Sequence, residues 1–282
     1  MEKIDRLVWA EGFTFNSYGV RVGVRINRSG YLDRFAPFLP PVWKHSSARL
    51  VDRVYSIIVG GEGSRAGVRL LNVVYANANR LARVAEFDRA MHAFESDLQL
   101  YVAESAPSRV FVHAGVVGWN GKAVLIAGRS FSGKTSLVAA LVRAGATYYS
   151  DEYAVLDKLG RVHHYARPLA VRENGHLERP TRYQVEAIGG HAGVRPLQVG
   201  LVLVSEYASG AMWRPRCLSA GEGALALMAN TVAARRQPEA TLETLHRVVI
   251  DAPVFKGKRG EANQLVDFIS RHLGRLEERP RG

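Results

Sequence analysis

The chain reads Ala123-Val-Leu-Ile-Ala127 and then Gly128-Arg129-Ser130-Phe131-Ser132-Gly133-Lys134-Thr135-Ser136. The apolar run has the length and continuity of a strand that is buried on both faces of a sheet. The residues that follow fit the pattern G-x-x-x-x-G-K-[ST], which is typical of phosphate-binding loops, also known as P-loops or Walker A motifs. The stretch therefore predicts a strand that leads into a nucleotide-binding loop, with residues 128–136 around the nucleotide.

Each residue type in this loop suits phosphate binding. Glycine at positions 128 and 133 lets the backbone turn tightly, so that successive N–H groups form an anion-binding concavity at the start of a helix. Lys134 is expected to reach the terminal phosphates, and the Thr135 hydroxyl to bind Mg²⁺, which takes few protein ligands. The helix predicted over residues 135–144 has apolar residues at helical spacing and ends at a glycine, Gly145.

An acidic pair follows this helix. Residues 146–149 lead back into the sheet, and Asp151 and Glu152 come at the end of that strand. Ligands collect outside the carboxyl ends of parallel strands, so this pair predicts a magnesium contact and a catalytic base. Two other acids also follow apolar runs, Glu206 and Asp251, although the residues before Asp251 have helical spacing.

A β-hairpin is predicted just before the loop. The strand 110–117 is joined to the strand 123–127 through an Asn-Gly turn at residues 120 and 121. His113 lies in the otherwise apolar first strand of this hairpin. Its position alone fits a buried core histidine.

The composition limits the class of protein. The chain has 282 residues, 47% of them hydrophobic, one cysteine and a formal net charge of +12. One cysteine excludes an internal disulfide, and no apolar run is long enough to span a membrane, so a cytoplasmic protein is expected. The arginines are scattered; the local clusters at 235–236 and 256–259 are interpreted as solvated faces, which argues against nucleic-acid binding and leaves an acidic or phosphorylated partner as the better fit.

The predicted fold class is α/β or α+β. Residues 1–82 alternate apolar and polar residues in short runs and predict a β-rich N-terminal module. Residues 83–109 predict a linking amphipathic helix that packs on the nucleotide domain, and residues 110–273 form that domain. Residues 274–282 are a charged tail.

The array of His113, the loop, Gly145 and the acidic pair resembles HPr kinase/phosphorylase, in particular its catalytic C-terminal domain and the related kinase-like proteins. The resemblance covers residues 110–155 well and the rest of the domain loosely. It implies a P-loop kinase domain related in active-site layout to phosphoenolpyruvate carboxykinase, and a tendency to form homo-oligomers. It also implies transfer of the γ-phosphoryl group of ATP to a serine.

The resemblance further implies roles for single residues. Lys134 would grip the β and γ phosphates, Thr135 would bind magnesium, and His113 would lie near the transferring phosphate. Asp151 matches the first and Glu152 the second acidic residue of the family, of which the second serves as the base. From the residues alone, either carboxylate fits the base, with the other in support.

The expected function is thus an ATP- and Mg²⁺-dependent kinase that phosphorylates a serine or similar hydroxyl of a protein or peptide acceptor. Two alternatives remain open at this stage. One is a nucleotide-binding regulatory protein or slow ATPase without an acceptor, and the other is a basic nucleic-acid-binding protein.

Overall fold

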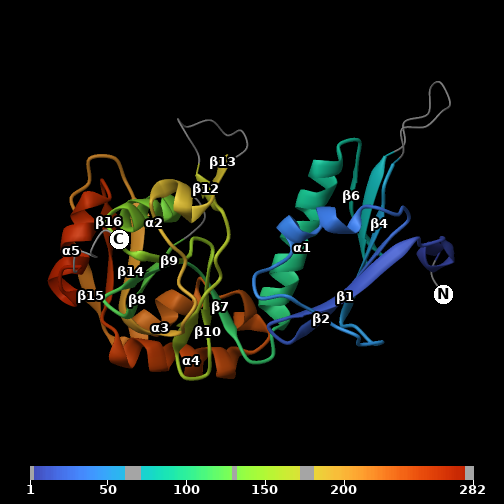
Figure 1. Cartoon of the computed structure of the whole chain (residues 1–282). Helices are drawn as coiled ribbons and strands as arrows, with labels where there is room; N and C mark the ends of the chain where they lie inside the picture. Colours follow the sequence, from blue (N-terminus) through green and yellow to red (C-terminus); the bar gives the residue numbers. More distant parts are fainter. Residues whose placement is uncertain (1–2, 61–70, 129–131, 172–180, 277–282) are drawn as a thin grey trace. The chain divides into compact units, whose positions relative to one another are not determined.

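The computed structural model describes residues 3–60, 71–128, 132–171 and 181–276 (Figure 1). The chain divides into two compact units, Met1–Ser108 and Arg109–Gly282. Each unit combines helices with a β-sheet, so the mixed α/β class predicted from the sequence is confirmed. None of the helices in the described part of the chain is both long and apolar enough to cross a lipid bilayer.

The first unit is built on a six-stranded sheet with the order β3-β1-β2-β4-β5-β6. Its strands are β1 (Glu11–Ser17), β2 (Val20–Ile26), β3 (Lys44–His45), β4 (Arg53–Ile58), β5 (Asn72–Ala76) and β6 (Asn79–Val84). Three short 3-10 helices accompany them, η1 (Lys3–Arg6), η2 (Leu32–Arg34) and η3 (Ala36–Phe38). The β-rich character expected of the N-terminal residues is present in these strands.

Helix α1 (Phe87–Ser105) belongs to the first unit. The Phe94 ring packs edge-on against Tyr55 of β4, with 5.0 Å between the ring centroids, and against Phe35, at 5.7 Å. The Asp97 carboxylate accepts hydrogen bonds of 2.6 Å from both Tyr55 and Arg53. Residues 83–109 were predicted to form a linking helix, and in the structure the apolar stripe of α1 covers the sheet of the first unit.

The second unit contains an eight-stranded sheet with the order β11-β10-β7-β8-β14-β16-β15, in which β9 also pairs with β7. Its strands are β7 (Val110–Trp119), β8 (Lys122–Ala127), β9 (Thr147–Ser150), β10 (Tyr153–Leu156), β11 (Arg161–His163), β14 (Leu197–Tyr207), β15 (Arg216–Leu218) and β16 (Val254–Arg259). A separate pair is formed by β12 (Leu169–Val171) and β13 (Thr181–Tyr183).

Helices cover both faces of this sheet. They are α2 (Lys134–Arg143), α3 (Ala220–Met228), α4 (Pro238–Asp251) and α5 (Asn263–Leu273), with 3-10 helices η4 (Val185–Ile188) and η5 (Val232–Arg235). Alternate residues of β8 pack into two cores: Leu125 lies in the core with α3 and α4, and Ile126 lies in the core with α2 and α5. Figure 1 shows the two helix pairs on opposite sides of the strands. The continuous apolar run of β8 is therefore buried on both faces, as predicted.

Local signals in the sequence match the turns of this unit. The turn between β7 and β8 has positive φ at both Asn120 (46°) and Gly121 (75°), as an Asn-Gly hairpin turn requires. Ser219 and Glu222 form the reciprocal hydrogen bonds of a capping box at the start of α3. The predicted Asn-Gly turn was confirmed, and the predicted helix 135–144 corresponds to α2 with small shifts at its ends.

Strands β8 and β9 both pair antiparallel with β7, so they run in the same direction. β8 pairs parallel with β14, and β14 pairs parallel with β16. The carboxyl ends of β8, β9, β14 and β16 therefore lie at one edge of the sheet. The loop, the acidic pair and the residue Arg259 are thereby brought to that edge.

Gly115 in β7 allows α2 to pack closely on the sheet. A Cβ atom at this position would lie 2.5 Å from Cγ2 of Val138, which is fully buried in α2. Val138 cannot move without disturbing the core around it. The missing side chain at position 115 thus sets how closely the helix that begins at Lys134 approaches the sheet.

We predict that Gly115→Ala lowers the free energy of unfolding by about 1–3 kcal/mol through overpacking against Val138. Val138→Ala alone should also destabilise, by about 1–3 kcal/mol, because it leaves a cavity. In the double variant the alanine at 115 fills part of that cavity, so the combined loss should be smaller than the sum by about 1 kcal/mol or more. Urea denaturation measures all three variants, and strictly additive losses would contradict this packing.

Candidate functional site

Strand β8 ends just before Gly128, and α2 begins at Lys134. Gly133 is the N-cap of α2 and has a φ of +81°, which favours glycine. The Lys134 ammonium folds back on the loop, where Nζ donates to the Gly128 carbonyl oxygen at 2.7 Å. Burial lowers the pKa of Lys134, and the negative charges of Asp151 and Glu152 act in the opposite direction.

Neighbouring strands hold the loop from outside. The Tyr207 backbone N–H, at the end of β14, donates to the Ser132 carbonyl oxygen at 3.2 Å. Ser132 is 8% exposed, and its hydroxyl is buried with no hydrogen-bond partner among the described residues. A buried hydroxyl without a partner is costly, and a bound acceptor group would satisfy it.

Of the remaining residues predicted to surround the nucleotide, the structure describes Thr135 and Ser136. Ser136 lies on the exposed side of α2, and Thr135 is partly buried. Arg129, Ser130 and Phe131 were predicted to contact the nucleotide and lie outside the described residues.

Asp151 is held in place by three groups. The Tyr148 hydroxyl donates to its Oδ1 at 3.0 Å, the Ala170 backbone N–H approaches its Oδ2 at 3.5 Å, and the Thr135 hydroxyl also hydrogen-bonds to it. Burial raises the pKa of Asp151 in spite of these bonds. The predicted pair of Thr135 and Asp151 is thus brought together, although the two residues come from different elements.

The turn between β9 and β10 presents the acidic pair. The buried Ser150 hydroxyl accepts hydrogen bonds from the backbone N–H groups of Glu152, at 3.1 Å, and Tyr153, at 2.9 Å. These bonds shape a local serine turn of the kind that replaces strand pairing. Consequently Asp151 and Glu152 are both partly buried at the edge of the sheet, beside Lys134.

His113 lies at the same edge, in the register of β7 next to the end of β8. Its ring packs on Tyr153 with 4.7 Å between centroids. Burial and the nearby positive charge of Lys134 both lower the pKa of His113, while a hydrogen bond with the backbone of Glu152 raises it. His113 is therefore a half-buried histidine within the electrostatic reach of Lys134.

The two alternative acidic residues, Glu206 and Asp251, lie at opposite ends of the parallel strands. Glu206 is exposed near the end of β14, at the edge of the loop. Asp251 is the exposed last residue of α4, and it precedes the first residue of β16, Val254. Asp251 thus lies at the amino end of the parallel strands, away from the loop, so the helical spacing that weakened it in the sequence was a correct indication.

The Thr135 and Asp151 pair fits a magnesium ion. Both side chains supply oxygen, and the Thr135 hydroxyl is close enough to Asp151 to lower the pKa of its carboxyl group. Mg²⁺ is held by few protein ligands and keeps several waters. The described residues contain no group of three or more His, Cys, Asp or Glu that could hold a metal, and a magnesium site of this kind needs none.

Arg259 is a site residue that sequence reasoning missed. The 256–259 cluster was interpreted as a solvated face, which is right for Lys256 and Lys258 and wrong for Arg259, whose exposed fraction is 3%. Arg259 ends β16, and its Nη2 donates to the Gly133 carbonyl oxygen at 2.7 Å. The apolar and polar pattern of β16 does not predict the burial of Arg259. That burial depends on the end of β16 lying next to the loop, which the sequence of the strand does not show.

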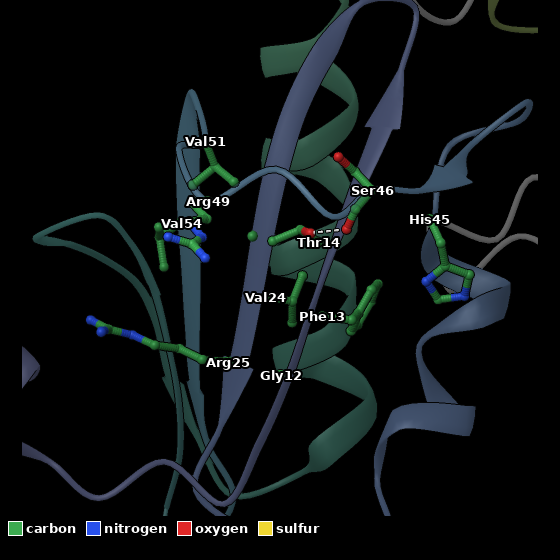
Figure 2. Close-up of a pocket in the computed structure, with 11 residues that line it drawn as sticks. Gly12, Phe13, Thr14, Val24, Arg25, His45, Ser46, Arg49, Val51 and Val54 are labelled. Atoms are coloured by element: carbon green, nitrogen blue, oxygen red, sulfur yellow. Dashed lines mark hydrogen bonds between the residues drawn. The ribbon is translucent and has the colours of Figure 1, made fainter.

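A groove of about 560 Å³ also lies in the first unit, on the face of the sheet formed by β1, β2 and β4 (Figure 2). The absence of side chains at Gly12 and Gly23 opens it, and the Thr14 hydroxyl donates to the Ser46 carbonyl oxygen across it. Arg25 is already engaged by Asp5 at 2.6 Å and by Ser56 at 2.7 Å. The other ionisable residues that line the groove, His45 and Arg49, are basic, whereas the edge at the loop brings a lysine together with two carboxylates.

No known protein-family model matches the chain, and no curated protein matches it either.

We predict that Lys134→Ala weakens the affinity for MgATP at least about tenfold, because it removes an ammonium group that hydrogen-bonds to the loop. Isothermal titration calorimetry measures the dissociation constant. Lys158→Ala is the matched control, since this lysine is exposed in the turn between β10 and β11. Equal affinities in wild type and Lys134→Ala would contradict the assignment of the loop.

Proposed function

We propose that the protein is an ATP- and Mg²⁺-dependent kinase that transfers the γ-phosphoryl group to a serine or similar hydroxyl of a protein or peptide acceptor. One observation carries the proposal: Lys134, Thr135, His113 and the acidic pair converge at one edge of the sheet. Phosphoryl transfer is catalysed mainly by positioning and charge neutralisation, together with a carboxylate near the acceptor. A basic group, an oxygen pair for magnesium and a second carboxylate meet these needs.

The loop and α2 would bind the phosphates of ATP. Backbone N–H groups at the N-terminus of α2 favour anions, and Lys134 adds a full positive charge. The Lys134 ammonium donates a hydrogen bond to the Gly128 carbonyl oxygen. A phosphate oxygen would compete for this donor, because charge-assisted hydrogen bonds are stronger than those to a neutral carbonyl.

Magnesium, held by Thr135 and Asp151, would neutralise charge on the phosphates. The bonds from Tyr148 and Ala170 would keep the Asp151 carboxylate oriented toward Thr135. Tyr148 and the backbone at Ala170 are thus supporting groups for the metal pair.

Glu152 is the residue proposed as the base. Asp151 is already committed to Thr135 and its other donors, whereas Glu152 follows it on the same turn and lies within the electrostatic reach of Lys134. A carboxylate at this place could accept the proton of the acceptor hydroxyl as the oxygen attacks the γ-phosphorus. His113, whose lowered pKa favours the neutral ring, would donate or accept a hydrogen bond next to the phosphates.

The kinase is favoured over a switch that only binds nucleotide because the turn at 150–153 presents a second carboxylate in addition to the one that pairs with Thr135. A protein that only binds nucleotide needs the metal pair and the loop, and no base for an acceptor.

We predict that Glu152→Gln preserves MgATP affinity within about threefold and slows phosphoryl transfer by about 10²–10⁴-fold, as expected for loss of a general base. Asp151→Asn should instead weaken magnesium-dependent ATP binding, because it removes a charged metal ligand. Transfer is followed with γ-³²P-ATP and a library of serine-containing peptides, and calorimetry gives the affinities.

Glu186→Gln is the control, since this glutamate is exposed in η4 of the same unit. Free phosphate in place of labelled peptide would favour the ATPase or switch. Full transfer activity in Glu152→Gln would remove Glu152 from the role of base.

A further inference from the structure

Arg259 is a buried cation at the carboxyl end of β16. Its guanidinium donates through Nη2 to the Gly133 carbonyl oxygen at 2.7 Å and through Nη1 to the Gly260 carbonyl oxygen at 3.0 Å. The third guanidinium nitrogen, Nε, is buried and has no hydrogen-bond partner among the described residues. The guanidinium also lies 5.5 Å from the centre of the Tyr207 ring.

Among the described residues, no carboxylate forms an ion pair with Arg259. Both of its hydrogen-bond partners are neutral backbone carbonyls, and the acidic residue whose charge it senses, Glu261, is exposed. Burial outweighs that attraction and lowers the pKa of Arg259. A buried charge without a counter-charge is costly. Such a cost suits a site that receives an anion.

The bond to Gly133 acts on the loop itself. The Gly133 carbonyl and the Lys134 N–H belong to one peptide group, so a cation on the oxygen polarises the N–H on the other side. The Lys134 N–H is the first amide of α2, in the part of the helix where anions bind. Arg259 is thus connected through one planar peptide to a proposed phosphate donor.

Gly133 leaves room for this contact. A Cβ atom at position 133 would lie 2.6 Å from Arg259 Nη2 and 3.2 Å from Tyr207 Cβ. The glycine is therefore required both by its positive φ and by the close approach of the guanidinium.

We infer that Arg259 is a positioning residue for the phosphates of the nucleotide, which it serves by fixing and polarising the Gly133–Lys134 peptide and by placing a buried positive charge next to that peptide. This inference rests on the proposed function. Since its action is electrostatic, it contributes more to binding as the number of phosphate charges on the ligand increases.

The test compares the affinities of ATP, ADP and AMP, with magnesium held constant, in the full-length wild type, Arg259→Met and Arg259→Lys. Arg259→Met removes the charge and the bond to Gly133 while keeping a long side chain. We expect it to weaken ATP binding on the order of 10- to 100-fold and AMP binding much less, so that the ratio of ATP to AMP affinity falls. Arg259→Lys should give an intermediate ratio, because it keeps the charge without the paired donors.

Lys258→Met is the matched control. It removes the same charge from the neighbouring residue of β16, whose side chain is exposed, and solvent screening should leave the ratio within about twofold of wild type. Near-ultraviolet circular dichroism verifies that each variant is folded. If Arg259→Met does not fold, Arg259→Lys decides the question by the same ratio.

The outcomes separate the two proposals. A lowered ratio in the Arg259 variants supports the inference, because a merely structural role would weaken all three ligands equally. Equal losses for ATP and AMP, or an unchanged ratio, in a wild type that binds ATP would overturn the inference and leave the proposed function standing. A wild type that binds none of the three nucleotides would overturn both.

Discussion

The shared direction of β8, β9, β14 and β16 is the constraint on which the site depends. Because these strands run the same way, each delivers its next residues to one edge: the loop after β8, the acidic pair after β9, Tyr207 at the end of β14 and Arg259 at the end of β16. β7 makes this possible, since it pairs antiparallel with both β8 and β9. A single long strand thereby aligns the glycine loop with two carboxylates that follow it in the chain after only one helix.

Local backbone turns and burial determine the geometry and the pKa values of the residues at this edge. The positive φ of Gly133 and the serine turn at Ser150 present the backbone and the carboxylates, and burial shifts the pKa values of Lys134, Asp151 and His113. Burial favours the neutral form of each of these groups. A ligand that carries both negative phosphates and a divalent cation, such as the proposed magnesium nucleotide, would stabilise the charged forms of these groups.

Much of this unit could be predicted from the sequence where a signal is local. The apolar run of β8, the Asn-Gly turn, the capping box at Ser219 and the helical spacing after Lys134 each depend on near neighbours, and the structure has each of them. Placement of Arg259 and of α1 depends on partners distant in the chain. The charge of Arg259 reads as part of an exposed Lys and Arg run, and its burial follows only from β16 lying beside β14. The apolar stripe of α1 predicts that one face of the helix is buried, but it does not predict which of the two sheets buries it.

The central claim is that the carboxyl edge of β8 and β9 binds a magnesium nucleotide. Hydrogen–deuterium exchange with and without a magnesium complex of a non-hydrolysable ATP analogue tests it most directly, because amides that bind phosphate exchange more slowly. We predict added protection in peptides that cover residues 128–136 and 150–153, and no change in those that cover β1 to β6. Unchanged exchange at residues 128–136 under saturating analogue, or protection confined to the first unit, would contradict the account.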